Sequence, residues 1–194
     1  MAKQKKSCTW HGDNKQMIEY HDTEWGVPLH DDRKLFEFMV LDAFQAGLSW
    51  AIVLKKRESF RKAFSNYDVK KIAKYDVQKV AELLNNEGII RNKMKILAAI
   101  KNAQVFLNVQ KEFGSFDKFI WQFTNYKTVV NKWKTLKDIP PKSAISDVMS
   151  KDLKQRGFGF VGSTICYSFM QAAGMVNDHI VECFRYKEVQ KIKN

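Results

Sequence analysis

The stretch Leu41-Asp42-Ala43-Phe44-Gln45-Ala46-Gly47-Leu48-Ser49-Trp50 organises the chain around its candidate site. Upstream, the i, i+3, i+4, i+7 spacing gathers four side chains on one buried helical face: Leu35, Phe38, Met39 and Asp42. Asp42 is thus a single carboxylate on an otherwise apolar stripe. Gly47 ends or bends this helix, and a polar turn carries Trp50 back towards the same place.

A buried Asp42 needs a partner, because a carboxylate removed from water costs several kcal/mol unless a cation or a hydrogen-bond donor meets it. One interpretation is structural, with Asp42 capping a helix or pairing with a buried arginine or backbone amide. The other is a pocket for a flat, positively charged ligand, with Asp42 as the counter-charge and Trp50 as a wall. The stretch alone leaves both interpretations open.

Length and composition predict a folded, soluble protein. With 194 residues, 45% apolar and 13% aromatic, the chain is expected to form one domain over residues 1–194, with two interleaved helical lobes and flexible ends at 1–7 and 187–194. No apolar run approaches a membrane span, so no membrane partner is expected. The first residues contain no apolar signal-peptide core, and the three cysteines argue against a disulfide framework. We therefore expect a cytoplasmic monomer.

The charge is unevenly distributed along the chain. Residues 1–50 contain six Lys/Arg and eight Asp/Glu, whereas residues 51–194 carry a net charge of +14. A basic body favours a polyanionic partner, with nucleic acid first and an anionic membrane surface second. Many basic proteins bind no nucleic acid, so the charge leaves this question to the motifs.

Periodicity and break signals predict an all-α chain without a convincing strand. Helices are expected at residues 30–43, 51–64, 69–74, 77–85, 92–111, 118–123, 146–155 and 163–175. Asp31 and Asp32 suit the start of the first of these helices, and Asp117 suits the start of the helix at 118–123. Residues 20–28 are expected to be irregular and to end at Pro28.

Gly88 lies between two expected helices, as in a helix-hairpin-helix motif. Such a turn directs backbone N–H groups and a helix N-terminus outward, which makes a phosphate site. Arg91, Lys93 and Lys95 add positive charge beside it for a DNA strand. Gly88 could equally be an ordinary helix C-cap.

Cysteine and histidine occur in pairs near both ends of the chain. His179 and Cys183 are four residues apart, which is one helical turn, and Cys8 and His21 form a second pair. Two imidazoles and two thiolates complete a closed tetrahedral Zn²⁺ site of the structural kind. The split spacing matches no compact zinc motif, so four unrelated residues remain the alternative.

Several motifs together resemble the DNA-3-methyladenine glycosylase I family. They are residues 8–10 (CTW), 20–28 (YHDTEWGVP), 45–50 (QAGLSW), 54–57 (LKKR), 88–91 (GIIR), 154–158 (KQRGF), 160–172 (FVGSTICYSFMQA) and 176–179 (VNDH). The resemblance implies an all-α helix-hairpin-helix DNA glycosylase fold. It also implies that Cys8, His21, His179 and Cys183 hold one structural Zn²⁺ ion, which joins the N- and C-terminal segments.

The resemblance further implies hydrolysis of the N-glycosidic bond of 3-methyladenine in double-stranded DNA, a base excision repair activity. Asp42 would be the catalytic residue that favours the cationic base, and four aromatic side chains would bind it: Tyr20 and Trp50 by stacking, Trp10 and Trp25 as walls. Leu48, on the Gly47 turn, would fill the gap left in the duplex. The hairpin pattern described above adds Gly88, Arg91 and Lys93 as expected contacts to DNA phosphates.

No lysine is placed as an obvious Schiff-base nucleophile, so we expect base excision without strand cleavage. The alternative is a zinc-clipped protein that recognises damaged or abasic DNA without catalysis. A third possibility is a structural or RNA-associated basic protein.

The chain departs from the family pattern at three positions. Asp42 stands where the family usually has glutamate, Ala43 where glycine is common, and Met17 where some relatives have a tyrosine. Aspartate keeps the charge but is one methylene shorter. The base must then sit closer, a water must bridge, or Phe44 must reshape the floor of the pocket.

Overall fold

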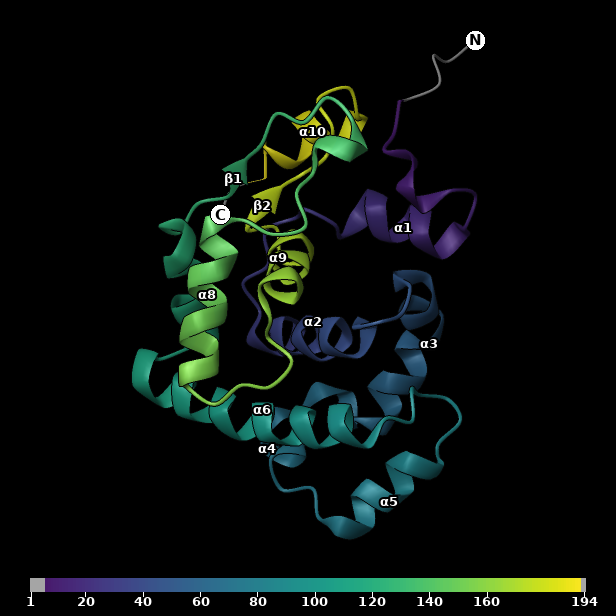
Figure 1. The fold of residues 1–194 in the computed structure, drawn as a ribbon, viewed down its shortest axis with the longest axis vertical. Helices are drawn as coiled ribbons and strands as arrows, with labels where there is room; N and C mark the ends of the chain where they lie inside the picture. The colour runs from purple at the N-terminus through teal and green to yellow at the C-terminus, as the bar shows by residue number, and fades with distance from the viewer. Residues whose placement is uncertain (1–5, 193–194) are drawn as a thin grey trace.

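Helix α2 (Asp32–Gln45) lies at the centre of the computed structural model, which describes residues 6–192 (Figure 1). Residues 35–44 are all buried, so α2 is enclosed on every side and the expected apolar face is only part of its packing. Asp31 caps the helix by accepting a hydrogen bond from the Lys34 N–H. Gly47, with φ of +80°, turns the chain just beyond its end.

The other helices and strands are α1 (Lys15–Thr23), α3 (Trp50–Ala63), α4 (Val69–Ile72), α5 (Val77–Asn85), α6 (Lys93–Phe113), α7 (Phe116–Trp121), α8 (Ala144–Gln155), α9 (Ser163–Ala172), α10 (Phe184–Val189), β1 (Val129–Val130) and β2 (Val176–Asn177). Short 3₁₀ helices include η1 (Thr9–His11) and η4 (Leu136–Asp138). The predicted helical fold is confirmed. The expectation that the chain contains no strand was wrong, because β1 and β2 pair in parallel. Each strand has only two residues, too few to show the alternating pattern by which a strand is recognised in a sequence.

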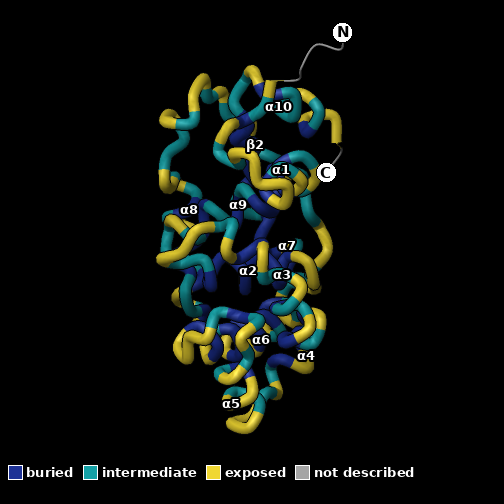
Figure 2. The backbone as a smooth tube through the Cα atoms, turned by 90° about the vertical axis from the view of Figure 1, so that its right-hand side faces the viewer, coloured by how far each residue is buried: buried dark blue, intermediate teal, exposed yellow. Residues whose placement is uncertain are grey.

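The molecule is elongated, and other helices pack around α2 on the side of either end of the molecule (Figure 1). Helix α2 contacts α3, α6, α7 and α9, and the long α6 crosses beneath it (Figure 1). The buried backbone follows α2, α6 and α9 through the interior, whereas the outer turns are exposed (Figure 2). No helix within residues 6–192 is both long enough and apolar enough to cross a bilayer.

The expectation of an irregular segment at residues 20–28 was wrong for residues 20–23, which are helical. Tyr20 and His21 lie on α1, which Asn14 caps by accepting hydrogen bonds from the backbone N–H groups of Gln16 and Met17. Pro28 lies five residues beyond the end of α1, so it does not interrupt the helix.

Two capping expectations were also wrong. Ser115, not Asp117, caps α7, and Asp117 instead pairs with His30 at 2.7 Å. Asp32 does not cap its own helix but accepts hydrogen bonds from the backbone N–H groups of Phe116 and Asp117. A carboxylate satisfies whichever helix N-terminus packs beside it, and the sequence does not show that packing.

Part of the C-terminal stretch expected to be flexible is helical, since residues 187–189 belong to α10. Residues 1–5 and 193–194, also in the expected flexible ends, lie outside the described residues.

Candidate functional site

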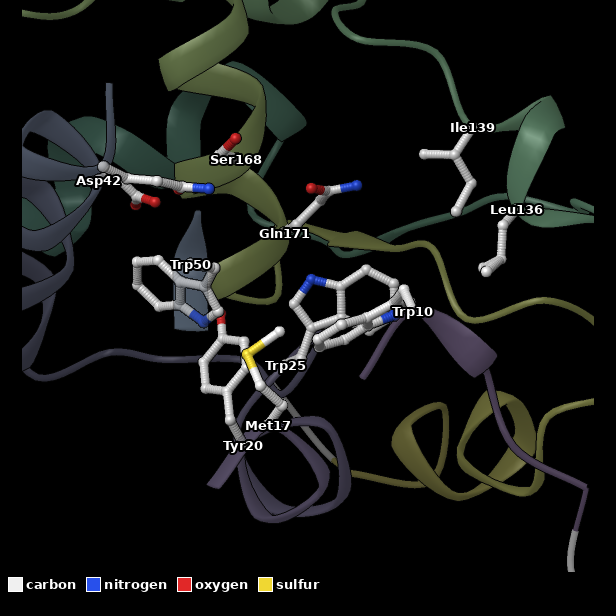
Figure 3. A pocket seen from close by; sticks show the side chains of 11 residues that line it. Trp10, Met17, Tyr20, Trp25, Asp42, Trp50, Leu136, Ile139, Ser168 and Gln171 are labelled. Carbon is white, nitrogen blue, oxygen red and sulfur yellow. The ribbon is translucent and has the colours of Figure 1, made fainter. Parts of the chain in front are cut away.

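A cavity of about 320 Å³ opens between α1, the end of α2, α9 and the 3₁₀ helix η4 (Figure 3). Eleven side chains line it: Trp10, Met17, Tyr20, Trp25, Asp42, Gln45, Trp50, Leu136, Ile139, Ser168 and Gln171. The structure thus brings together all five residues predicted to bind the base. It adds six that the motifs did not assign to the pocket walls, and two of those come from η4 and the residue that follows it.

Asp42 lies at the inner end of this cavity and is only 2% exposed. Its Oδ2 atom has no hydrogen-bond partner within the described chain, and burial raises the pKa of the carboxyl well above its usual value. The structural interpretation required a buried arginine or a backbone amide to satisfy this oxygen. The structure instead leaves the Oδ2 atom unpartnered beside the cavity.

Aromatic rings enclose the cavity next to Asp42. The ring centroids of Tyr20 and Trp50 are 5.2 Å apart and tilted by 54°, and those of Trp10 and Trp25 are 5.1 Å apart in an edge-to-face arrangement. Burial raises the pKa of Tyr20 well above its usual value, and the negative charge of Asp42 raises it further. Flat apolar walls beside one carboxylate suit a planar cation.

Unsatisfied polar atoms are concentrated at this cavity. Among residues 6–192, five buried side-chain atoms lack a hydrogen-bond partner, and three of them belong to cavity residues: Trp10 Nε1, Trp50 Nε1 and Asp42 Oδ2. Buried polar groups are normally satisfied, so a cluster of unsatisfied ones indicates that a ligand completes the site. Trp10 and Trp50 therefore present hydrogen-bond donors as well as ring faces, a role that the sequence did not indicate.

Cys166 lies behind Asp42, outside the main cavity. Its thiol is buried and donates to the Val161 carbonyl at 3.3 Å. Burial, with a smaller contribution from Asp42, raises the pKa of Cys166 to about 12. The thiol is therefore protonated and serves packing.

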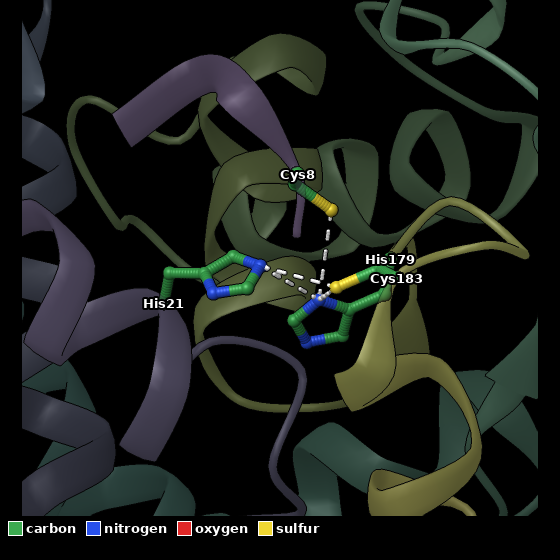
Figure 4. A group of neighbouring side chains, drawn as sticks. All are labelled: Cys8, His21, His179 and Cys183. Carbon is green, nitrogen blue, oxygen red and sulfur yellow. Dashed lines mark hydrogen bonds between the residues drawn. The ribbon is translucent and has the colours of Figure 1, made fainter. Parts of the chain in front are cut away.

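Cys8, His21, His179 and Cys183 form a buried cluster that could hold a metal ion (Figure 4). Their candidate ligand atoms all lie within 4.8 Å of one another. His179 Nδ1 is 3.2 Å from His21 Nε2, 3.6 Å from Cys183 Sγ and 3.8 Å from Cys8 Sγ. The prediction that these four residues meet is correct, although the expected helical turn from His179 to Cys183 was wrong. These residues form a turn ahead of α10, because Cys183 is the N-cap of that helix.

Partners on the far side of each imidazole fix the orientation of the two rings. His21 Nδ1 is 2.6 Å from the Asp22 carboxylate, and His179 Nε2 is 3.0 Å from the Trp25 carbonyl. Each ring therefore turns its other nitrogen towards the cluster, which is the arrangement found around protein metal sites. A hydrogen bond from Cys8 lowers the pKa of Cys183, a shift in the direction of the thiolate form that binds metals.

Lysine side chains attach the turn after α2 to helix α6, and the hairpin between α5 and α6 to helix α3. The expectation that Lys95 adds charge for a DNA strand was wrong, because this side chain is buried and its Nζ donates to the carbonyls of Phe44 at 2.9 Å and Ala46 at 2.6 Å. Lys56 Nζ donates to the Glu87 carbonyl at 2.7 Å. These bonds fix two backbone turns that the chain separates by about forty residues. Leu48, on the first turn, is 40% exposed.

The hairpin glycine is required by close packing. A Cβ atom at Gly88 would lie 2.9 Å from Ser59 Cβ and 2.9 Å from Asn86 Oδ1. The C-cap of α5 is Asn86, so Gly88 is not an ordinary cap. The nearby Arg91 and Lys93 are exposed, and Arg91 lies 3.8 Å from Glu87.

Comparisons with known proteins agree with this geometry. Residues 10–186 match the family model for methyladenine glycosylase. The DNA-3-methyladenine glycosylase 1 of Escherichia coli is 48% identical over 179 residues, which cover 92% of this chain and 96% of that protein. A crystal structure of a 3-methyladenine DNA glycosylase I superposes with a TM-score of 0.90 at 48% identity, covering 92% of this chain and 98% of the other. A second family structure, a complex with 3-methyladenine, has a TM-score of 0.89 at 32% identity and covers 92% of this chain and 96% of the other. With the aromatic pocket and its buried carboxylate, these matches show that the chain belongs to the methyladenine glycosylase family.

Proposed function

We propose that this protein hydrolyses the N-glycosidic bond of 3-methyladenine in double-stranded DNA and does not cleave the strand. Family membership supports the activity. The observation that carries the assignment to these residues is the Asp42 Oδ2 atom, buried without a partner at the wall of an aromatic cavity. A protein that only gripped a DNA backbone would gain nothing from an unpaired buried acid, because such a group destabilises the fold.

The chemistry follows from the charge of the lesion. A 3-methyladenine base in DNA is cationic, so it is already a good leaving group. The protein needs only to extrude the base, at a cost of a few kcal/mol of unstacking, and to hold it while water attacks the sugar. Asp42 favours the positive charge, Tyr20 and Trp50 stack on the ring, and Trp10 and Trp25 close the walls. A cation over an aromatic face gains up to about 2 kcal/mol when it is desolvated.

We assign the DNA contacts to the two turns that Lys95 and Lys56 hold. Leu48, beside Gly47, enters the gap that the extruded base leaves in the duplex, as apolar wedges do. Gly88, Arg91 and Lys93 contact backbone phosphates. The exposure of Leu48, Arg91 and Lys93 supports this assignment.

We further propose that the Cys8, His21, His179 and Cys183 cluster holds one structural Zn²⁺ ion. Tetrahedral Zn²⁺ with Zn–N near 2.0 Å and Zn–S near 2.3 Å places its ligand atoms about 3.3 to 3.8 Å apart. Four of the six distances between the ligand atoms, 3.2 to 3.8 Å, fit that size, and all six are within 4.8 Å. An ion bound there would cross-link the two ends of the chain and would take no part in the reaction.

A base-release assay tests the proposal. The protein is incubated with methylated duplex DNA, and free 3-methyladenine is measured beside strand breaks. We expect base release without breaks, and about a 10- to 100-fold loss in Asp42→Asn, since the variant removes a charge-assisted contact. Glu58→Gln, an exposed acid-to-amide change on α3, is the control and keeps full activity. No free base from the unaltered protein would refute the proposal.

The alternative is a protein that binds damaged or abasic DNA without catalysis. Tight binding of abasic duplex together with no base release would favour it. The unpaired Asp42 carboxylate argues for the glycosylase.

We also propose that the chain acts as a monomeric single domain over residues 1–194 in the cytoplasm. Cys8, Cys166 and Cys183 form no disulfide bond, which suits a reducing compartment.

A further inference from the structure

Gln171 on α9 has an amide whose orientation is fixed from outside the pocket. Its Nε2 atom donates to Asp178 Oδ2 at 2.8 Å. Asp178 is 1% exposed, and a carboxylate can only accept such a bond. The amide nitrogen of Gln171 must therefore face Asp178.

Asp178 is itself held by three other donors, so it cannot easily turn away. Asn131 Nδ2 and Trp133 Nε1 donate to Oδ1 at 2.7 and 2.8 Å, and Tyr167 donates to Oδ2 at 2.7 Å. A flipped Gln171 amide would place its oxygen against this carboxylate, so that the two acceptors repel each other and the bond from Gln171 is lost. The network therefore fixes a single orientation of Gln171.

That orientation leaves the Gln171 oxygen for the cavity. Figure 3 shows this oxygen on the side of Asp42 and Ser168, and the nitrogen on the other side. The acceptor groups that line the pocket thus include the Asp42 carboxylate from α2 and Gln171 Oε1 from α9. Among the described residues, the fully buried donors of the pocket that lack a partner are the indole N–H groups of Trp10 and Trp50.

The acceptors distinguish two alkylated purines, whereas the donors do not. A methyladenine carries an amino group at C6 with two N–H donors, and a methylguanine carries a carbonyl oxygen there. Both bases have ring nitrogens that can accept from an indole N–H. An oxygen facing an oxygen leaves two desolvated acceptors, a mismatch that costs roughly tenfold or more in affinity.

We infer that Gln171 is a specificity-determining residue whose acceptor oxygen selects 3-methyladenine over 3-methylguanine, and that Asp178 is the positioning residue that holds it. This inference rests on the proposed glycosylase function and concerns which of the two methylated bases the protein releases faster.

Release of the two bases from one methylated duplex tests the inference. The quantity measured is the ratio of the 3-methyladenine rate to the 3-methylguanine rate. Gln171→Met keeps the size of the side chain and removes its acceptor, so we expect the ratio to fall about tenfold, mostly through slower 3-methyladenine release. Asp178→Asn frees the amide to flip and should lower the ratio in the same direction.

Tyr167→Phe is the matched control. It removes one donor from the same Asp178 oxygen but leaves the Gln171 bond in place, so the ratio should stay within about twofold of the unaltered protein. Thermal unfolding and metal content confirm that each variant is folded. An unchanged ratio in folded Gln171→Met would overturn the inference. So would an equal shift in Tyr167→Phe, since the network would then act through the fold alone.

Affinities for the free bases separate this inference from the proposed function. They are measured by quenching of the tryptophan fluorescence, to which Trp10 and Trp50 in the cavity contribute. A protein that releases neither base contradicts the proposed function. The free-base affinity ratio still decides the inference, which stands only if Gln171→Met lowers the preference for 3-methyladenine about tenfold.

Discussion

At the scale of single residues, Asp42 should lower stability in exchange for function. Burial raises its pKa above the value in the unfolded chain. A carboxyl shifted in this direction costs no stability below its unfolded pKa, and costs progressively more as the pH rises towards the folded pKa. We therefore expect Asp42→Asn to be more stable than the unaltered protein at pH 7, by roughly 1–3 kcal/mol, and this gain to shrink towards about pH 4.

Urea unfolding of both proteins at pH 7 and near pH 4.5 checks this expectation. Glu58→Gln serves again as the exposed control and should change stability by less than about 0.5 kcal/mol. An Asp42→Asn variant that is less stable than the unaltered protein at pH 7 would mean that the carboxylate is satisfied in solution. That result would remove the main support for an electrostatic role.

A second residue-scale prediction concerns the length of the acid. Asp42→Glu keeps the negative charge and adds one methylene, which restores the residue that the family usually has. The Asp42 carboxylate borders the 320 Å³ cavity, so the longer side chain has space in front of it. We expect 3-methyladenine release to stay within about tenfold of the unaltered protein, in contrast to Asp42→Asn. Equal losses in both variants would show that position, not charge, decides activity.

At the scale of elements, Lys95 should determine how well the wedge turn, residues 46–49, is formed. Its ammonium group lies at the C-terminal end of α2, where the helix dipole favours a cation, and it donates to two carbonyls there. Burial lowers the pKa of Lys95, because removal from water disfavours the charged ammonium form. We expect Lys95→Met to weaken binding of abasic duplex DNA about tenfold, because the turn that carries Leu48 loses its support, while affinity for the free base is unchanged.

Lys101→Met, an exposed change on the same helix, separates this effect from the loss of one positive charge. Both variants lose one charge, so the salt dependence of DNA binding should change equally in the two. Equal affinities for abasic DNA in the two variants would assign the role of Lys95 to charge alone.

Most of the helices could be predicted from sequence because they have a local signal. The stripe through Leu35, Phe38 and Met39 gives α2, and Asn92 before an apolar period gives the start of α6. Helix α1 was missed because its start depends on Asn14, a cap without a clear apolar period after it. The turn at residues 179–183 was missed because spacing alone does not separate a helical turn from an irregular one that side chains stabilise.

At the scale of the whole molecule, the pocket could be predicted only in part. Motifs and the resemblance named its aromatic walls, but Leu136 and Ile139 reach it from the linker between β1 and α8, whose path depends on long-range contacts. Asn131 and Trp133 attach that linker to Asp178, some forty-five residues later. Such contacts join residues that share no period, so no single sequence reveals them. The same holds for the direction in which Gln171 points.

The metal cluster joins residues from the two ends of the chain, and its removal should affect the pocket as well as the stability. Cys8 lies two residues before Trp10, and His21 directly follows Tyr20, so two metal ligands neighbour two pocket walls. Chelation or Cys183→Ser should therefore lower the free energy of unfolding by several kcal/mol and reduce base release in parallel, since the chain ends are no longer joined. Cys166→Ser, a buried cysteine outside the cluster, should keep one metal ion per chain and most of the activity. Metal analysis, thermal unfolding and base release on the same samples decide the matter. A chelated protein with unchanged unfolding and unchanged release would show that hydrogen bonds alone hold the ends together.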